Sequence, residues 1–272
     1  MSGGKSEFTK RALTGAAYVA LTSGAAIAGP WTTLLLFLPV CIIAAREWHQ
    51  LMGAGEEDRP GGVEHMVLAA STYLAIGIIP MVKGWTIAHA AAVLLMSMVI
   101  LAYGMMRKGM AGPGAVFSGY IATIGYIALP FSLTTALLED GPQPFLGFMF
   151  LLWTSDTGAY LVGRAIGRTK LMPAVSPGKT WEGLLGGVAL TMVVGWMLSQ
   201  YWTVLSPSQW MVGAAAVAVT ATLGDLLESA FKRARGVKDS GTVLPGHGGI
   251  MDRFDGFLLA APAMLLVIRM LS

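Results

Sequence analysis

The sequence predicts an all-α, polytopic integral membrane protein with about nine transmembrane helices. Hydrophobic residues make up 55% of the 272 residues, and only 12% of the residues are charged. Apolar stretches recur from one end of the chain to the other. Because about 20 apolar residues in a helix are enough to cross a bilayer, this composition is typical of a membrane protein rather than a soluble domain.

Nine apolar segments follow one another along the chain. Several of them contain glycine, proline and small residues, which membrane helices tolerate better than soluble helices do. The Gly183–Gly187 pair in one segment predicts close packing against another helix. We expect helices over approximately residues 12–28, 30–45, 64–80, 85–103, 114–137, 145–163, 181–202, 209–231 and 256–271.

The positions of Lys and Arg predict the orientation of these helices. If the N-terminus is cytoplasmic and each segment crosses once, only Lys83 and Arg269 of the 18 basic residues fall outside. Cytoplasmic loops of membrane proteins carry such an excess of basic residues. We therefore expect a cytoplasmic N-terminus and an outer C-terminus. The net charge of +3 reflects this bias and does not indicate nucleic acid binding.

Two aspartates lie within apolar segments rather than beside them. Asp156 and Asp225 are each about seven residues from the cytoplasmic end of a segment, roughly 10 Å deep at 1.5 Å per residue. A lone ionised carboxylate at that depth costs roughly 2.5–3.5 kcal/mol on insertion scales. Each aspartate should therefore face a wet cavity or the protein interior, and the alternative is a structural polar contact between helices.

Asp225 shares a helix face with other polar side chains. Glu228 follows at i+3 and Ser229 at i+4, and Lys232 follows Glu228 at i+4. Side chains at these spacings are neighbours on a helix surface. The segment therefore presents carboxylate, hydroxyl and ammonium groups in order towards the cytoplasm.

The stretch KDSGTVLPGHGGIMDRFDG, residues 238–256, then returns to the membrane through Asp252 and Asp255. These two aspartates and Asp225 can meet at one depth, where their mutual repulsion calls for a hard cation. Carboxylate oxygens suit Mg²⁺, and the scattered histidines offer no zinc-type spacing. We expect a magnesium site there.

Basic residues and glycines surround this expected metal. Such an arrangement is typical of sites for phosphoryl or nucleotidyl transfer, where the metal neutralises the charge on phosphate oxygens. The glycines of 245–249 would let backbone N–H groups approach phosphate, and Lys179 is expected to contact it. The surroundings of Lys179 lack the first glycine of a P-loop, and 246–251 fails the GxGxxG spacing.

Several short motifs carry these residues. In the last part of the chain they are Ser229-Ala-Phe-Lys-Arg233, Lys238-Asp-Ser-Gly241, Leu244-Pro-Gly-His-Gly-Gly249 and Asp252-Arg-Phe-Asp255. Upstream are Asp156-Thr-Gly-Ala-Tyr160 and Ser176-Pro-Gly-Lys-Thr-Trp-Glu-Gly183. Over roughly residues 150–260 the chain resembles the phosphatidate cytidylyltransferases, also called CDP-diacylglycerol synthases.

The resemblance implies a membrane nucleotidyltransferase that joins CTP to phosphatidic acid, giving CDP-diacylglycerol and pyrophosphate for phospholipid biosynthesis. It implies Mg²⁺ bound by Asp225, Asp252 and Asp255, and it allows a second cation such as K⁺. It also implies a homodimer among membrane lipids, in the bacterial inner (plasma) membrane with the active site facing the cytoplasm.

The site residues and regions are assigned on this basis as hypotheses. The catalytic residues are Lys179, Asp225, Ser229 and Asp252. The substrate-binding residues are Asp156, Lys179, Lys232, Arg233, Lys238, Asp239, His247, Gly248 and Arg253. The N-terminal transmembrane scaffold covers 1–140, and the catalytic transmembrane region covers 141–272 with cytoplasmic loops 164–180 and 232–255.

Three other classes of protein are alternatives, and one of them, a purely structural membrane protein, would have no use for these carboxylates. An ion-coupled transporter could use Asp156 and Asp225 as a relay, but it would predict repeat symmetry, which the sequence lacks. A CTP-dependent polyprenol kinase would transfer the γ-phosphoryl group instead of the nucleotidyl group. The position of the transferred phosphorus distinguishes the two enzymes.

Overall fold

The computed structural model describes residues 3–53, 62–107, 113–241 and 248–272, and most of these residues are helical. Two short strands, β1 (Lys170–Met172) and β2 (Ser176–Thr180), form an antiparallel hairpin. The helices are α1 (Gly3–Ala28), α2 (Pro30–Gly53), α3 (Val63–Gly77), α4 (Ile87–Arg107), α5 (Pro113–Ala122), the π-helix η1 (Thr123–Ala128), α6 (Leu129–Ser132), the 3₁₀-helix η2 (Ala136–Leu138), α7 (Gln143–Ile166), α8 (Trp181–Tyr201), α9 (Pro207–Ala234) and α10 (Met251–Met270).

The prediction of an all-α membrane protein is confirmed, and the hairpin is the one addition within the described residues. Each predicted apolar segment overlaps helical structure. Five stretches of the described chain are long and apolar enough to cross a membrane: Pro30–Met52, Phe117–Leu138, Gln143–Ile166, Trp181–Tyr201 and Pro207–Ala234.

Two of the remaining helices, α3 and α10, fall short of a span for physical reasons. Helix α3 has 15 residues and so rises only about 22 Å, less than the ~30 Å hydrocarbon core. Helix α10 carries Asp252, Arg253 and Asp255 near its start, and Arg269 near its end. The number of nine spans stays a prediction.

The segment 164–180, predicted as a loop, is largely ordered. Helix α7 continues to Ile166, and the hairpin fills most of the remainder. The Glu182 carboxylate accepts hydrogen bonds from the backbone N–H groups of Arg168 and Thr169 at 3.1 Å. Thr180 caps α8 by accepting from the Gly183 N–H. These bonds fasten the hairpin to the start of α8.

The predicted close packing at Gly183 and Gly187 is confirmed against α7. A Cβ at Gly183 would lie 2.9 Å from the Ala159 carbonyl oxygen, and a Cβ at Gly187 would lie 3.0 Å from that of Ser155. Small residues allow helix backbones in membranes to approach this closely. The two helices therefore meet backbone to backbone.

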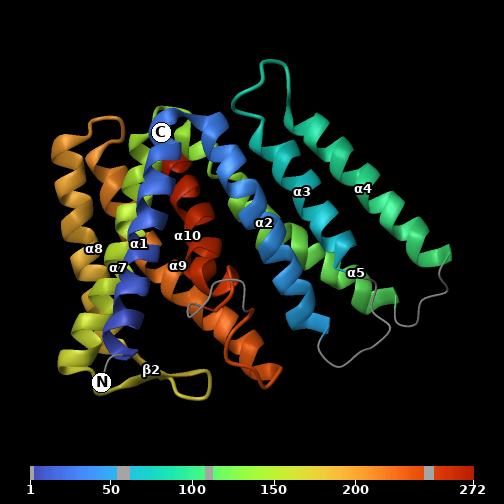
Figure 1. The fold of residues 1–272 in the computed structure, drawn as a ribbon. Coiled ribbons are helices and arrows are strands. Elements are labelled where there is room, and N and C mark those ends of the chain that lie inside the picture. Colours follow the sequence, from blue (N-terminus) through green and yellow to red (C-terminus); the bar gives the residue numbers. More distant parts are fainter. Residues whose placement is uncertain (1–2, 54–61, 108–112, 242–247) are drawn as a thin grey trace.

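The helices form two groups with α2 between them (Figure 1). Helices α1 and α7–α10 lie on one side, and α3–α5 lie on the other. An aromatic core joins the predicted regions across this arrangement. The Phe257 ring lies 6.0 Å from that of Phe37 on α2, 5.3 Å from that of Phe131 on α6 and 5.5 Å from that of Phe254.

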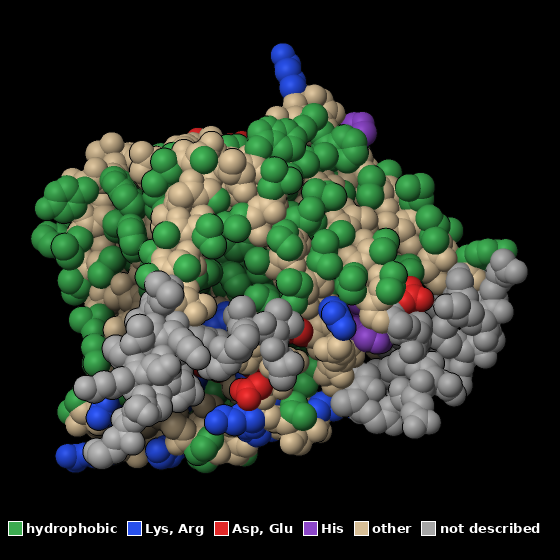
Figure 2. Space-filling view, in the orientation of Figure 1, with side chains coloured by type: hydrophobic (Ala, Val, Ile, Leu, Met, Phe, Trp, Pro, Cys, Tyr) green, Lys and Arg blue, Asp and Glu red, His purple; other side chains and the backbone are tan. Residues whose placement is uncertain are grey.

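Charged side chains gather at one end of the molecule. Figure 2 shows an apolar surface over most of the visible face and most of the visible charged groups along the lower edge. That edge holds the hairpin and the start of the chain, whereas the chain ends at the opposite end (Figure 1). The molecule thus has one polar end and an apolar middle, as a membrane protein requires.

Candidate active site

Two cavities open among the helices near the polar end. The large pocket, of about 1310 Å³, lies between α1, α2, α7, α10 and residues of 238–250. The small pocket, of about 440 Å³, lies between α7, the hairpin, α8 and α9. Asp156 on α7 lines both pockets. The predicted intramembrane carboxylate therefore faces a cavity, as its cost in an apolar helix requires.

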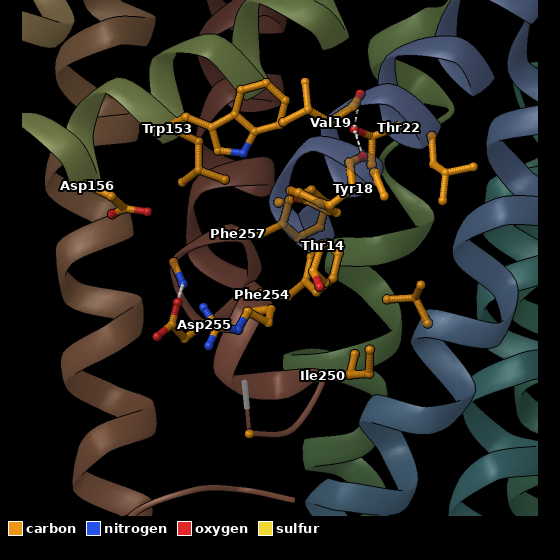
Figure 3. A pocket seen from close by; sticks show the side chains of 18 of the residues that line it. Thr14, Tyr18, Val19, Thr22, Trp153, Asp156, Ile250, Phe254, Asp255 and Phe257 are labelled. Atoms are coloured by element: carbon orange, nitrogen blue, oxygen red, sulfur yellow. Dashed lines mark hydrogen bonds between the residues drawn. The ribbon is translucent and has the colours of Figure 1, made fainter. Parts of the chain in front are cut away.

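The large pocket has an aromatic side and a charged side. Figure 3 shows Tyr18, Trp153, Phe254 and Phe257 around the cavity, with the carboxylate of Asp156 beside it. Near the polar end it is lined by Lys238, Asp239, Gly248, Arg253 and Asp255. Such a pocket suits a ligand with an apolar body and a charged head.

An ion pair, here called the open pair, lies in the small pocket. Lys179 Nζ on β2 lies 2.6 Å from Asp225 Oδ2 on α9, and the two side chains are 24% and 35% exposed. Ser229 Oγ donates to Asp225 Oδ1 at 3.2 Å. The structure thus unites three of the four predicted catalytic residues, and two of them, Lys179 and Asp225, line the small pocket.

A second cluster, here called the buried triad, links α9 to α10. Lys232 Nζ lies 3.0 Å from Glu228 Oε2 and 2.6 Å from Asp252 Oδ1. The side chains of Glu228, Lys232 and Asp252 are 0%, 9% and 10% exposed. One ammonium thus lies between two carboxylates, and Glu228 Oε1 is buried without a hydrogen-bond partner in the part of the chain that the structure describes. Removing the lysine would leave both carboxylates buried without a cation.

The other oxygen of Asp252 holds the chain that precedes α10. Asp252 Oδ2 accepts hydrogen bonds from the N–H groups of Ser240 (2.9 Å) and Gly249 (2.8 Å) and from Ser240 Oγ (3.0 Å). Gly248 has φ +79°, and a Cβ there would lie 2.7 Å from the same oxygen. Only glycine combines this backbone conformation with such a close carboxylate.

Asp255 lies one turn further along α10 and lines the large pocket. One carboxylate oxygen accepts from the Gly256 N–H at 2.6 Å (Figure 3). Asp225, Glu228 and Asp156 are close enough to Asp255 to interact with it electrostatically. The carboxylates near the two pockets therefore repel one another and concentrate negative charge in one region.

The predicted metal ligands can be tested against this geometry. Within the described ranges, no three His, Cys, Asp or Glu side chains lie close enough together to hold a metal ion. Lysine ammonium groups instead neutralise Asp225 and Asp252. The three predicted ligands still fit Mg²⁺ in type, because all are carboxylates. Two of them, Asp225 and Asp252, each already lie against a lysine ammonium group.

The remaining predicted residues are spread around the pockets. Lys238, Asp239 and Arg253 are exposed and line the large pocket. Arg233 donates to the Val237 carbonyl oxygen at 2.8 Å, so it closes the turn after α9. His247 lies outside the described residues.

One residue of this region was absent from the prediction. Glu47 on α2 is 1% exposed, and its carboxylate accepts from the backbone N–H groups of Ile250 and Met251. The sequence held a signal, because Glu47 is the only acidic residue between Glu7 and Glu56. It lies just beyond the apolar segment 30–45, where an acid is easily taken as part of a loop.

The fold and the pockets define an all-α membrane protein with a charged centre that is accessible to both apolar and polar ligands. A sequence model of the Cytidylyltransferase family matches residues 9–271. The chain is similar to phosphatidate cytidylyltransferase of Staphylococcus haemolyticus, with 36% identity over 183 residues, 66% of this chain and 69% of the relative.

It is also similar to the phosphatidate cytidylyltransferases of Staphylococcus epidermidis and Staphylococcus aureus. These are 34% and 33% identical to it over 206 residues, 74% of this chain and 78% of each relative. The chain therefore belongs to the cytidylyltransferase family.

Proposed function

We propose that the protein joins CTP to phosphatidic acid and releases CDP-diacylglycerol and pyrophosphate for phospholipid biosynthesis. Family membership and the names of its relatives support this activity. The structural observation that carries it is that Asp156 lines both an amphipathic pocket and a charged one. Two substrates of different character can therefore meet at one place.

The large pocket is the proposed lipid site. Its volume of about 1310 Å³ exceeds the roughly 300–1,000 Å³ of an ordinary small-molecule pocket, which suits a ligand with two acyl chains. The aromatic rings would contact the chains, and Lys238 and Arg253 would contact the lipid phosphate. Both basic residues line the pocket near Asp255.

The small pocket is the proposed nucleotide site. Its volume of about 440 Å³ lies in the range for small ligands, and Arg164 and Lys179 line it. In the reaction an oxygen of the lipid phosphate bonds to the α-phosphorus of CTP, and the bond from that phosphorus to the bridging oxygen breaks. Pyrophosphate leaves with the electron pair.

The lysines stabilise charge in this step. The side chain of Lys179 would move from Asp225 to the triphosphate, where a positive charge offsets the charge that develops on pyrophosphate. A strong base is not required, because a phosphate monoester with a second pKa near 6 is largely dianionic at neutral pH. Lys232, Arg233, Asp239, His247 and Gly248 remain predicted substrate contacts.

Mg²⁺ is the proposed cofactor, held by Asp225, Asp252 and Asp255, and K⁺ is a candidate second cation. Bound there, Mg²⁺ would supply positive charge to the phosphate oxygens. For one ion to bind all three carboxylates, Lys179 and Lys232 would have to release Asp225 and Asp252. Binding of Mg²⁺ would therefore replace the lysine ammonium groups at these carboxylates.

The membrane arrangement completes the proposal. Nine spans would place the N-terminus in the cytoplasm and the C-terminus outside, in a bacterial inner membrane, with the active site facing the cytoplasm. The opposite positions of the chain ends support an odd number of spans (Figure 1). Residues 1–140 would form the scaffold and 141–272 the catalytic region, with two copies in a homodimer.

Labelled CTP tests the reaction directly. Purified protein is given phosphatidic acid, Mg²⁺ and CTP labelled at either the α or the γ phosphate. We expect the α label in a lipid product and the γ label in pyrophosphate. A lipid that carries only the γ label would indicate a kinase, and no Mg²⁺-dependent product would contradict both enzymes.

A further inference from the structure

Glu47 connects the first half of the chain to the start of α10. It lies on α2 beside Ala44 and Ala45, which are fully buried, and its own side chain is 1% exposed. A carboxylate buried in a membrane protein is costly unless donors surround it. The described donors to Glu47 all come from the chain just before α10 or from its first residue.

The two carboxylate oxygens accept from the N–H groups of Ile250, the N-cap residue of α10, and of Met251, its first residue. Glu47 Oε1 accepts from the Ile250 N–H at 3.0 Å, and Oε2 accepts from the Met251 N–H at 2.9 Å. These groups have no partner inside their own helix, and the helix dipole favours a negative charge at this end. Glu47 thus performs, from 203 residues away, the role that a local capping residue usually performs.

The same carboxylate fills the space on both sides of residues 242–247. A Cβ at Gly241 would lie 2.5 Å from Glu47 Oε1, and a Cβ at Gly249 would lie 2.5 Å from Oε2. Ser240 Oγ also lies 3.4 Å from Oε2. The chain that leaves α9 and the chain that enters α10 therefore meet at one side chain of α2.

These contacts continue directly to Asp252. Ser240 and Gly249, which pack against Glu47, each donate a backbone N–H to Asp252 Oδ2. Asp252 in turn binds Lys232. The position of Asp252 therefore depends on backbone that Glu47 holds.

We propose that Glu47 is a positioning residue of the reaction: it fixes the base of the loop before α10 and so sets the position of Asp252. The proposal rests on the proposed function only for its effect on turnover. It assigns to α2 a part in the chemistry, beyond its part in the membrane scaffold.

Amide hydrogen exchange tests the contact without relying on activity. Glu47→Gln keeps the size of the side chain but replaces one acceptor oxygen with a donor, which would face a backbone N–H. We expect exchange in the peptide containing Ile250 and Met251 to rise about tenfold to a hundredfold, with no change in α8. Glu139→Gln is the control, because Glu139 is 44% exposed and pairs with Arg269.

Turnover tests the consequence. In Glu47→Gln we expect kcat to fall about tenfold to a hundredfold and the Mg²⁺ concentration for half-maximal activity to rise by a similar factor. A smaller folded fraction would lower the rate but would not shift the Mg²⁺ midpoint. If the exchange result holds but neither variant nor wild type has the activity, the proposed function fails while the contact stands.

A second variant approaches the contact from the other side. Gly249→Ala removes no charge but places a methyl group against Glu47 Oε2 and Ser240 Oγ. We expect the same local rise in exchange and the same loss of turnover, whether or not Glu47→Gln folds. The proposal is overturned if exchange at Ile250 and Met251 is unchanged, if it rises equally in all helices, or if turnover and the Mg²⁺ midpoint are normal despite local opening.

Discussion

The open pair and the buried triad both include side chains of α9, yet they differ in exposure and in access to a ligand. Lys179 and Asp225 are 24% and 35% exposed and line a pocket. Lys232, Glu228 and Asp252 are at most 10% exposed. Charges in the first set can exchange partners with a ligand at low cost, whereas exchange in the second set costs more because its charges are buried.

This difference separates two tasks that the sequence presents as one. Asp225, Lys232 and Asp252 belong to a single polar series when read along the chain. In the structure, Asp252 uses both oxygens to hold Lys232 and the loop, while Asp225 keeps its lysine at the mouth of a cavity. The buried triad fixes geometry, and the open pair is suited to substrate chemistry.

Loss of Lys232 should have the largest effect on stability. Lys232→Met leaves Glu228 and Asp252 buried without their cation, and we expect the free energy of unfolding to fall by about 3–5 kcal/mol. Denaturant unfolding in detergent measures it. Lys238→Met, at an exposed position, should unfold as wild type does. Equal stability of the two variants would mean that the triad is not held as described.

Loss of Lys179 should affect turnover more than stability. We expect Lys179→Met to lower kcat/KM for CTP about 100- to 1,000-fold, because one charge that stabilises the transition state is lost. The free energy of unfolding should fall by less than in Lys232→Met, because Asp225 is 35% exposed and faces a pocket, whereas Glu228 and Asp252 are buried. Lys170→Met, on the neighbouring strand, is the control. A variant that loses stability but keeps its kcat/KM would reverse the roles of the two clusters.

The contact between α7 and α8 should come next in size. Gly187→Leu forces a side chain against the Ser155 carbonyl and Ala159, and we expect a loss of about 1–3 kcal/mol in unfolding free energy. Gly24→Ala on α1 has open space and should not destabilise. Because α7 and α8 both line the small pocket, KM for CTP should rise as well. Full tolerance of Gly187→Leu would contradict the close contact.

The aromatic side of the large pocket should show the smallest effect. Trp153→Ala removes one apolar wall, and we expect KM for phosphatidic acid to rise about tenfold, which corresponds to about 1.4 kcal/mol. KM for CTP should not change. Trp196→Ala, which removes a tryptophan 57% exposed on α8, is the matched control. A rise in KM for CTP alone would mean that the large pocket binds the nucleotide and the small pocket binds the lipid.

Much of the fold follows from local sequence. Apolar segments locate the helices, and Gly183 and Gly187 identify a packing face, because these features depend only on residues near one another. The hairpin is less visible, since its two strands have three and five residues and its anchor is the Glu182 side chain. Nothing in so short a polar stretch separates a strand from a loop.

The sequence identified many residues of the candidate site but not which of them contact one another. Asp156 and Asp225 are conspicuous because a carboxylate is costly in an apolar segment. That Lys179 reaches Asp225, or that Glu47 reaches Ile250, depends on how distant helices pack. Local spacing favours the Glu228–Lys232 pair and gives no information on Asp252 as the third member.

The glycines between α7 and α8 also govern which parts of the molecule can move. Side chains between helices act as spacers that can change rotamer and so absorb displacement. Gly183 and Gly187 have no side chain to act as a spacer, and backbone atoms of α7 lie directly against them, so we expect α7, α8 and the hairpin between them to move as one unit. Any change in the width of the small pocket during turnover then falls to α9, the helix that carries Asp225.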